Sequence, residues 1–251
     1  MEPTNNGHAA LEAPHLTDAG NAKLLVRDHG ARLRYVPAWH CFLVYDGARW
    51  RVDDLGNVDR LAKATAASLY DEVILHDNDP KARRAFAEHA VRSEAEPRIR
   101  AMIKLAQSEP GIPVRPDQLD VDPMLLNLSN CTFDLRRWEP RAHDPADLCT
   151  QLAPVVYDPA AECPRWMTFL GRIFAGNDNL IAFMQQAIGY ALTGDTSEHV
   201  VFILWGAGAN GKSTLLATLA AMLGTGQPCD YAVTTRAETF MVKKGDGIPN
   251  D

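Results

Sequence analysis

The chain has 251 residues, 46% of them apolar and 23% charged, which excludes a wholly disordered chain, a collagen-like fibre and a disulfide-bonded mini-protein. This length predicts between one and two domains. Lys and Arg number 25 against 32 Asp and Glu, and the resulting net charge of −7 argues against a simple non-specific DNA coat protein.

The N-terminal segment is polar and has neither the basic flank nor the apolar core of a secretory signal. We therefore predict a disordered tail over residues 1–20. The longest apolar stretch, Val200–Trp205, is far shorter than the about 18 residues that a membrane span requires. We expect no membrane contact and a cytoplasmic location.

The five cysteines are odd in number and scattered, with no C-x-x-C pair. Structural zinc sites and disulfide frameworks use regularly spaced cysteines, so neither is expected. We predict reduced, buried thiols at Cys41, Cys131, Cys149, Cys163 and Cys229.

The first predicted elements are a helix and a β-hairpin. Apolar residues follow helical spacing over residues 22–29, and Gly30 suits the position after a helix end. Residues 41–45 and 48–52 read as two strands joined by Asp46-Gly47. This pair is favoured in tight hairpins because both turn residues then adopt positive φ.

Residues 56–107 are predicted to be helical, in two segments separated by Asn78-Asp79-Pro80. The second segment has a local charge of +4. Such a run is most often a solvated helix face, and the alternative is a surface that faces DNA or another subunit. The charges are Lys81, Arg83, Arg84, Arg92, Arg98, Arg100 and Lys104 against Glu88, Glu94 and Glu96.

Four prolines within residues 108–123 predict a connecting loop. A second hairpin follows, with strands 125–128 and 132–135 around Ser129-Asn130, and residues 151–159 are extended. Two amphipathic helices come next, and their apolar stripes are expected to be packing faces. The stripes are Trp166, Phe169, Leu170, Ile173 and Phe174, then Leu180, Phe183, Met184, Ala187, Ile188, Ala191 and Leu192.

The strongest motif is a glycine-rich loop between an apolar run and a helix. Val200–Leu204 is continuously apolar and β-branched-rich, which predicts a buried parallel strand. Residues 206–213, GAGANGKS, match the pattern G-x-x-x-x-G-K-[ST]. A leucine-rich helix follows, and Gly224 is expected to end it. Strand, loop and helix in this order are the context of a phosphate-binding P-loop.

Each residue type in the loop has a physical reason. Gly206, Gly208 and Gly211 let backbone N–H groups approach phosphate oxygens closely, and the following helix offers its N-terminal donors and dipole. Lys212 supplies a mobile positive charge to the β- and γ-phosphates, and the Ser213 hydroxyl suits Mg²⁺. The predicted phosphate-binding residues are Gly206, Ala207, Gly208, Ala209, Asn210, Gly211, Lys212, Ser213 and Thr214, with Lys212 and Ser213 also in the catalytic role.

A P-loop enzyme also needs an acid that ends an apolar strand. Neither Asp230 nor Asp246 follows such a strand, so we expect half of a nucleotide-binding domain with an incomplete parallel sheet. The pairs Asp53-Asp54 and Asp77/Asp79 are candidate metal ligands, but loop acids are usually only solvated. The histidines His40, His143 and His199 have no partner at ligand spacing and are expected to be structural.

Several segments resemble phage- and plasmid-type primase–helicases, which are superfamily 3 helicases with an AAA+ core. The resemblance runs from Leu16 to Asp251. It is carried by LTDAGNAKLLVRDHGARLRYVPAWHCFLVYDGARW, LLNLSNCTFDLRRWEPRAHDPADLCTQLAPVVYDPAAECPRWMTFL, LIAFMQQAIGYALTGDTSEHVVFILWGAGANGKSTLL and ETFMVKKGDGIPND. Asn130-Cys131 and Arg137-Trp138 depart from it, because they stand where Asn-Gly and Thr-Gly turns are usual.

The resemblance implies an ATP-driven, ring-forming DNA helicase, usually hexameric and in some members joined to a primase. It places the ATP and Mg²⁺ site at residues 206–214 and implies that the Walker B, sensor 1 and arginine-finger residues lie beyond Asp251. We expect the intact protein to bind single-stranded or forked DNA and to unwind DNA as a homo-hexamer with a primase partner. We expect this truncated chain to be inactive alone.

The expected fold combines α+β and α/β parts in four regions. They are a tail over 1–20, a mixed α+β domain over 21–160, a helical collar over 161–197 and the start of a P-loop AAA+ domain over 198–251. Two other functions remain open from the sequence. One is a different P-loop NTPase, such as a small-molecule kinase. The other is a non-catalytic remnant or interaction module that binds a replication partner.

Overall fold

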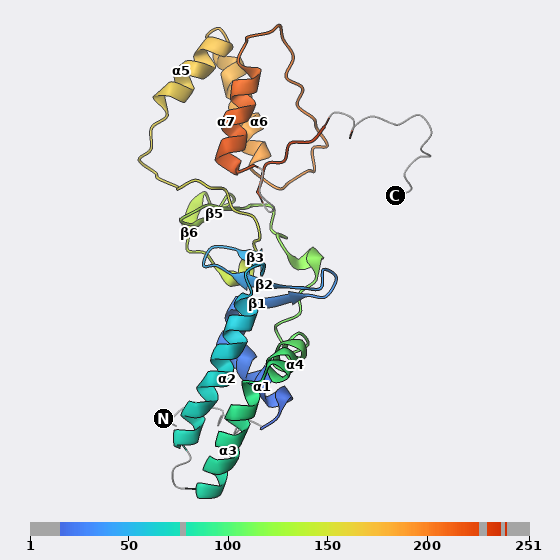
Figure 1. Ribbon diagram of the computed structural model, residues 1–251. Coiled ribbons are helices and arrows are strands. Elements are labelled where there is room, and N and C mark those ends of the chain that lie inside the picture. Colours follow the sequence, from blue (N-terminus) through green and yellow to red (C-terminus); the bar gives the residue numbers. More distant parts are fainter. Residues whose placement is uncertain (1–15, 76–78, 226–229, 237–238, 240–251) are drawn as a thin grey trace, which may run out of the picture. The chain divides into compact units, whose positions relative to one another are not determined.

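The computed structural model describes residues 16–75, 79–225, 230–236 and 239 (Figure 1). Contacts divide the chain into two units. The N-terminal unit comprises residues up to 46 and 50–119, and the C-terminal unit comprises residues 47–49 and those from 120 onward. Within the described ranges the fold is mixed α+β, with seven α-helices and two three-stranded antiparallel sheets. The predicted boundaries after residues 160 and 197 remain predictions.

Helix α1, Asp18–His29, opens the N-terminal unit. The hydroxyl of Thr17 accepts a hydrogen bond from the backbone N–H of Gly20 and caps the helix, so the last three residues of the predicted tail are helical. Residues 1–15 of that tail lie outside the described residues. The helix ends before Gly30, as expected, but Gly30 itself is right-handed and starts a short 3-10 turn, Gly30–Arg32.

Strands β1 (Leu33–Val36), β2 (Cys41–Tyr45) and β3 (Trp50–Val52) form an antiparallel meander. The predicted hairpin is present, but the prediction of its turn is wrong. Tyr45 pairs with Trp50, so the loop has four residues, and only Gly47 of the Asp46-Gly47 pair has positive φ. Strand β1 was not predicted.

The helical region contains three helices rather than two: α2 (Asn57–Leu75), α3 (Pro80–Ser93) and α4 (Glu96–Ala106). The predicted break before Pro80 is confirmed, since Asp79 caps α3 through the N–H groups of Lys81 and Ala82. The second break follows from Pro97, which lacks an N–H and cannot continue α3.

The core of the N-terminal unit lies between its helices and its sheet. Helices α1, α2 and α4 cover one face of the sheet, and Met102, Leu25 and Leu33 are almost fully buried there. A smaller contact joins α1, α2 and α3 through Leu24, Leu69 and Ala90.

The C-terminal unit begins with strands β4 (Leu125–Asn127), β5 (Thr132–Asp134) and β6 (Glu139–Arg141). The predicted second hairpin is confirmed as β4–β5, each strand one residue shorter than expected. Strand β6 was missed because its Glu-Pro-Arg sequence has no alternating apolar pattern. The loop over 108–123 is confirmed and includes a short 3-10 turn, Pro116–Gln118; another turn, Pro145–Asp147, follows β6.

Helices α5 (Pro164–Ile173), α6 (Asp178–Ala191) and α7 (Lys212–Leu223) confirm the last three predicted helices. Gly224, at φ +80°, stands directly after α7, as expected of the residue that ends it. Leu170, Ala187 and Leu215 are the buried residues of these helices in the described structure.

The predicted buried strand at Val200–Leu204 is wrong for the structure as described. The segment has no strand assignment, and Val201 and Ile203 are each 85% exposed. A strand requires neighbours to satisfy its N–H and C=O groups, and no described segment pairs with this run. No parallel sheet is therefore formed within the described residues.

The thiols agree only in part with the prediction of buried cysteines. Cys131 and Cys149 are buried, Cys41 is half-buried and Cys163 is exposed, while Cys229 lies outside the described residues. None of the described helices is long and apolar enough to cross a membrane.

Candidate functional site

The glycine-rich loop turns sharply into α7. Ala209 and Gly211 have φ of +58° and +85°, and the N-cap residue Gly211 has no side chain to cap the helix. The first N–H groups of a helix have no partner within it. At the start of α7 these N–H groups face the glycine-rich loop, which is the arrangement that binds an anion.

The Lys212 ammonium folds back over the loop. It donates to the carbonyl oxygens of Gly206 at 2.9 Å and Ala207 at 3.2 Å, and to the Asn210 side-chain oxygen at 2.7 Å. These three acceptors hold the positive charge of Lys212 over the loop. Ser213 and Thr214, in the first turn of α7, are exposed.

Glycine is required at two of the three predicted positions for different reasons. A Cβ at Gly211 would lie 2.5 Å from the Ile173 side chain, and a Cβ at Gly206 would collide with the Asn210 amide. A Cβ at Gly208 would meet no atom within 4 Å, so packing does not require glycine there. Phosphate binding at this loop remains a prediction.

A cavity of about 540 Å³ adjoins the loop. Lys212 and Asn210 are its polar lining residues, and no described lining residue is acidic. The Phe183 and Phe202 rings meet edge to face in its wall, with centroids 6.5 Å apart. The remaining lining residues are Ile173, Phe174, Leu180, Met184, Ala187, Ile188, Ala191, Ile203, Leu204, Trp205, Leu215, Leu216 and Leu219.

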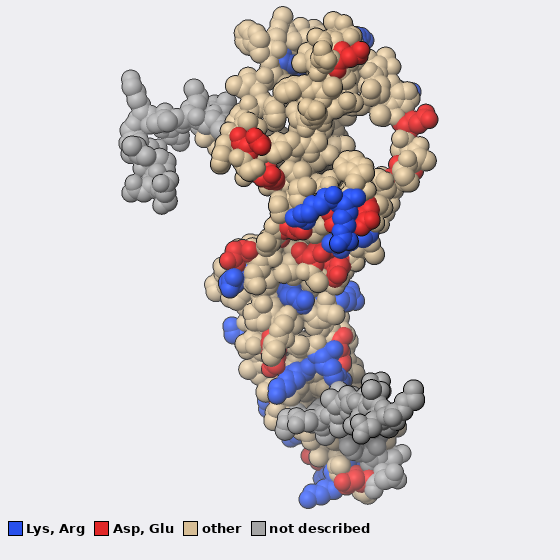
Figure 2. Space-filling view, turned by 180° about the vertical axis from the view of Figure 1, so that it is seen from behind, with Lys and Arg blue, Asp and Glu red and all other residues tan. Residues whose placement is uncertain are grey.

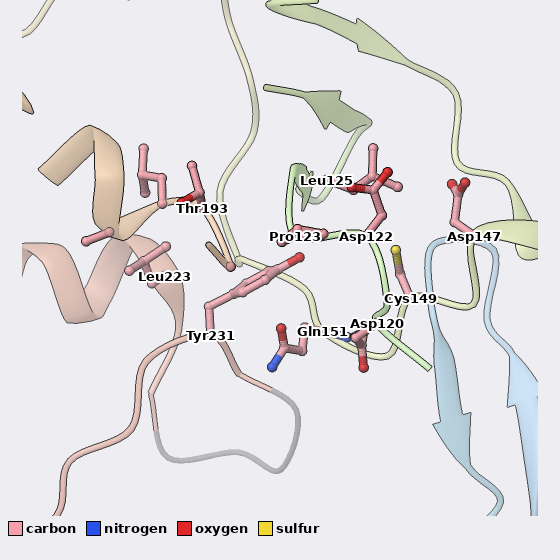
Figure 3. Close-up of a pocket in the computed structure, with 13 residues that line it drawn as sticks. Asp120, Asp122, Pro123, Leu125, Asp147, Cys149, Gln151, Thr193, Leu223 and Tyr231 are labelled. Carbon is pink, nitrogen blue, oxygen red and sulfur yellow. Dashed lines mark hydrogen bonds between the residues drawn. The ribbon is translucent and has the colours of Figure 1, made fainter. Parts of the chain in front are cut away.

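A second cavity, of about 220 Å³, lies where the segment after α7 meets the β4–β6 region (Figure 3). Asp147 and Cys149 line the side opposite Thr193 and Leu223, and Tyr231 points into the space between them. Sequence reasoning did not identify this cavity, because its lining comes from segments far apart in the chain.

The carboxylates of the second cavity are used within the chain. Asp120 accepts from the Thr150 N–H and hydroxyl, Asp122 binds both terminal nitrogens of Arg136, and Asp147 pairs with Arg141. No described group of His, Cys, Asp and Glu has the arrangement of a metal site. These hydrogen bonds and ion pairs join segments that are separate in the sequence.

The electrostatics of that cavity point the same way. The Arg136 guanidinium lowers the pKa of Asp122, which keeps this carboxylate ionised. Burial, with Asp120 nearby, raises the pKa of the Cys149 thiol to about 12, and burial also raises the pKa of Tyr231. An uncharged thiol of this kind is a poor nucleophile.

Asn127 is fully buried and is the centre of a hydrogen-bond network. Its amide nitrogen donates to the carbonyls of Ala48 and Gln151, and its oxygen is 2.9 Å from His143 Nδ1. The Thr132 hydroxyl also donates to this oxygen, and the Asn127 N–H donates to the Tyr231 hydroxyl. The network fixes β4 to the segment that follows α7.

Among the remaining sequence candidates, Asp53, Asp79 and His143 have structural roles. Asp53 accepts from the N–H groups of Asn57 and Val58 and caps α2, so it is a cap rather than a solvated acid or a metal ligand. Asp79 caps α3 in the same way, whereas Asp54 is exposed in the loop before α2 and Asp77 lies outside the described residues. His143 has the structural role expected of it, and His40 and His199 have positive φ in turns.

The basic helices α3 and α4 carry several ion pairs. Arg84 pairs with Glu88, Arg100 with Glu96, and Arg98 with Asp18. Figure 2 shows Lys and Arg side chains next to Asp and Glu side chains on the face of the molecule seen there. This pattern is that of a solvated surface, and the DNA-facing alternative remains a hypothesis.

Comparison with known families gives one match. The model of the family described as D5 N terminal like matches residues 22–175, which is more than half of the chain. None of the curated proteins matches the chain. The matched region runs from α1 through α5 and ends before the glycine-rich loop. The chain belongs to the D5 N terminal like family, the N-terminal region of phage and plasmid primase–helicase-like proteins, and this membership is consistent with a role in replication.

Proposed function

We propose that the protein is an ATP-dependent DNA helicase of phage- or plasmid-type replication that binds ATP and Mg²⁺ at residues 206–214. The observation that carries the proposal is the geometry of one loop. Gly211 is left-handed, α7 begins uncapped at Lys212, and the Lys212 ammonium is held over the loop. The family membership of residues 22–175 supplies the replication context.

The chain's own groups would divide the work as follows. The N–H groups at the start of α7 and the Lys212 ammonium would hold the phosphates by charge-assisted hydrogen bonds. The exposed Ser213 hydroxyl would serve as a ligand of Mg²⁺, which when bound neutralises the charge of the phosphates. The Lys212 side chain would exchange its three present oxygen acceptors for phosphate oxygens.

Hydrolysis requires more than this cradle. Ring NTPases add a water-positioning acid, and an arginine finger contributes roughly 10³–10⁵ in rate. No acidic residue lines the cavity beside Lys212 in the described structure. We therefore propose a homo-hexameric ring on single-stranded or forked DNA, with a primase partner, as the active form, and expect slow hydrolysis by the 251-residue chain alone.

Lys212→Ala should abolish most ATP binding without unfolding the chain. Removing a charged donor to phosphate costs about 1.5–3 kcal/mol, so the affinity should fall roughly 10- to 150-fold. Isothermal titration of the full chain with ATP and Mg²⁺ measures this directly. Lys63→Ala is the matched control, because Lys63 is exposed on α2 and does not line the cavity.

Ser213→Ala separates the two ligands. It should weaken binding of ATP with Mg²⁺ more than binding of ATP in EDTA, since the hydroxyl is assigned to the metal. Equal ATP affinity in wild type and Lys212→Ala would remove the loop from the proposed site, whatever the Ser213 variant does.

A further inference from the structure

The turn between β5 and β6 combines an exposed aromatic ring with an exposed guanidinium. Trp138 is 73% exposed although it is the largest side chain type, and its backbone has φ of +60°. Large side chains rarely adopt this left-handed conformation, which costs about 1–2 kcal/mol. Glycine or asparagine would form the same turn with less strain.

Packing accounts for little of this cost. The Trp138 ring meets Phe133 edge to face, with centroids 5.4 Å apart, and the rest of the indole faces solvent. The turn itself is closed by backbone: the Trp138 N–H donates to the Asp134 carbonyl at 2.8 Å, and the Asp134 carboxylate accepts from the N–H of Arg136. The hairpin does not need an indole at this position in order to form.

The neighbouring arginines differ from one another. Arg136 is held by Asp122 through two short hydrogen bonds. Arg137 is 74% exposed, and its nearest carboxylates are 3.9 Å away at Asp134 and 3.6 Å away at Glu139, beyond hydrogen-bond range. These two ion pairs are long and solvent-exposed and contribute little stability, so the Arg137 guanidinium can exchange them for another anion next to Trp138 in the chain.

We propose that the β5–β6 turn binds single-stranded nucleic acid, with a base stacked on the Trp138 indole and a phosphate paired with the Arg137 guanidinium. Aromatic stacking with an adjacent cation is the usual chemistry of single-strand binding. This inference rests on the proposed function in replication. The surface it concerns contains no residue of the glycine-rich loop.

The test measures binding of the full chain to fluorescein-labelled oligothymidylate and oligouridylate of about 20 nucleotides, by anisotropy without added nucleotide. Trp138→Gly should weaken binding of the preferred strand about 5- to 150-fold, since stacking one base contributes about 1–3 kcal/mol. Trp138→Phe should retain most of the affinity. Trp39→Ala is the matched control, because Trp39 is a 49% exposed tryptophan in the N-terminal unit.

Two further readouts separate a ligand contact from a structural role. Trp138→Gly should leave the melting temperature unchanged or higher, because glycine relieves the left-handed backbone. Arg137→Gln should reduce the slope of log affinity against log salt by about 0.7, the value for one phosphate contact on a single strand. Stronger binding of thymidylate would assign DNA, and stronger binding of uridylate would assign RNA.

The proposal fails if the wild-type chain binds neither strand, which would leave the turn to a protein partner. It also fails if Trp138→Gly binds like wild type, or if Trp39→Ala weakens binding equally. Should Trp138→Gly melt early, Arg137→Gln decides, and an unchanged affinity and salt slope overturn the proposal. ATP titration of the same variants tests the proposed ATP site separately, because their ATP affinity should equal that of the wild type.

Discussion

At the scale of single residues, His89 is held in a buried polar cluster between α1 and α3. Its Nε2 lies 2.8 Å from the Asn21 side-chain oxygen, and the Asn21 amide donates to the Ser93 hydroxyl. All three residues are almost fully buried. Burial and the nearby charges of Arg92 and Arg98 lower the pKa of His89, and Asp18 opposes them.

The folded chain should therefore lose stability as the pH falls. Unfolded histidine titrates near about 6.5, so below that pH the unfolded state binds a proton that folded His89 binds only at lower pH. The contribution of His89 to the free energy of unfolding should be fully present above about pH 6.5. Below that pH it should decrease by up to about 1.4 kcal/mol per pH unit. Urea denaturation between neutral and acidic pH measures the slope.

His89→Gln should flatten that slope, because glutamine cannot take up the proton. A slope that is the same in wild type and His89→Gln would show that other groups produce the acid sensitivity.

Residue-scale prediction from sequence succeeded where a side chain acts on its own neighbours. The Asp79-Pro80 break and the Gly224 stop depend on contacts within a few residues, and both are confirmed. The Asn127–Tyr231 hydrogen bond joins residues 104 positions apart, and no local sequence pattern predicts it. The sequence analysis missed the caps formed by Asp53 and Thr17, because it did not relate these side chains to the first residues of the helices that follow them.

At the scale of elements, the beginning of α7 depends on a glycine. Gly211→Ala would place a methyl group 2.5 Å from the Ile173 side chain of α5 and force a left-handed alanine. We expect the free energy of unfolding to fall by about 1–3 kcal/mol. Urea denaturation followed by tryptophan fluorescence measures this loss.

Gly208→Ala is the matched control three residues earlier. Its Cβ would meet no atom within 4 Å, so the change in stability should stay within about 0.5 kcal/mol. Equal losses in the two variants would mean that α5 does not pack against the loop as described.

Elements were predictable when their pattern was long and self-contained. Helices α1, α5, α6 and α7 and the β4–β5 hairpin follow from periodicity and turn residues. Strands β1 and β6 are short, and β6 has a proline, so pairing with a neighbour rather than local sequence makes them strands. The run Val200–Leu204 shows the converse, since an apolar sequence without a described neighbour is not a strand.

At the scale of the whole molecule, the family match and the glycine-rich loop occupy different parts of the chain. The match covers residues 22–175 and thus parts of both units, while the loop begins at Gly206. The family region could be anticipated from sequence because its resemblance is spread over many segments. The proposed activity could not be anticipated in the same way, because it would depend on ATP, Mg²⁺, DNA and subunit contacts that one chain does not contain.

The most direct test of the account is covalent labelling of the full chain with an acyl-phosphate derivative of ATP, followed by mass spectrometry. Such a probe acylates a lysine beside its terminal phosphate, so Lys212 should be the labelled residue, and excess ATP with Mg²⁺ should suppress the labelling. Lys63 and Lys104, both exposed in the N-terminal unit, serve as internal controls and should label weakly and without competition. Labelling of Lys212 no stronger than these, or unaffected by ATP, would contradict the assignment of residues 206–214 as the nucleotide site.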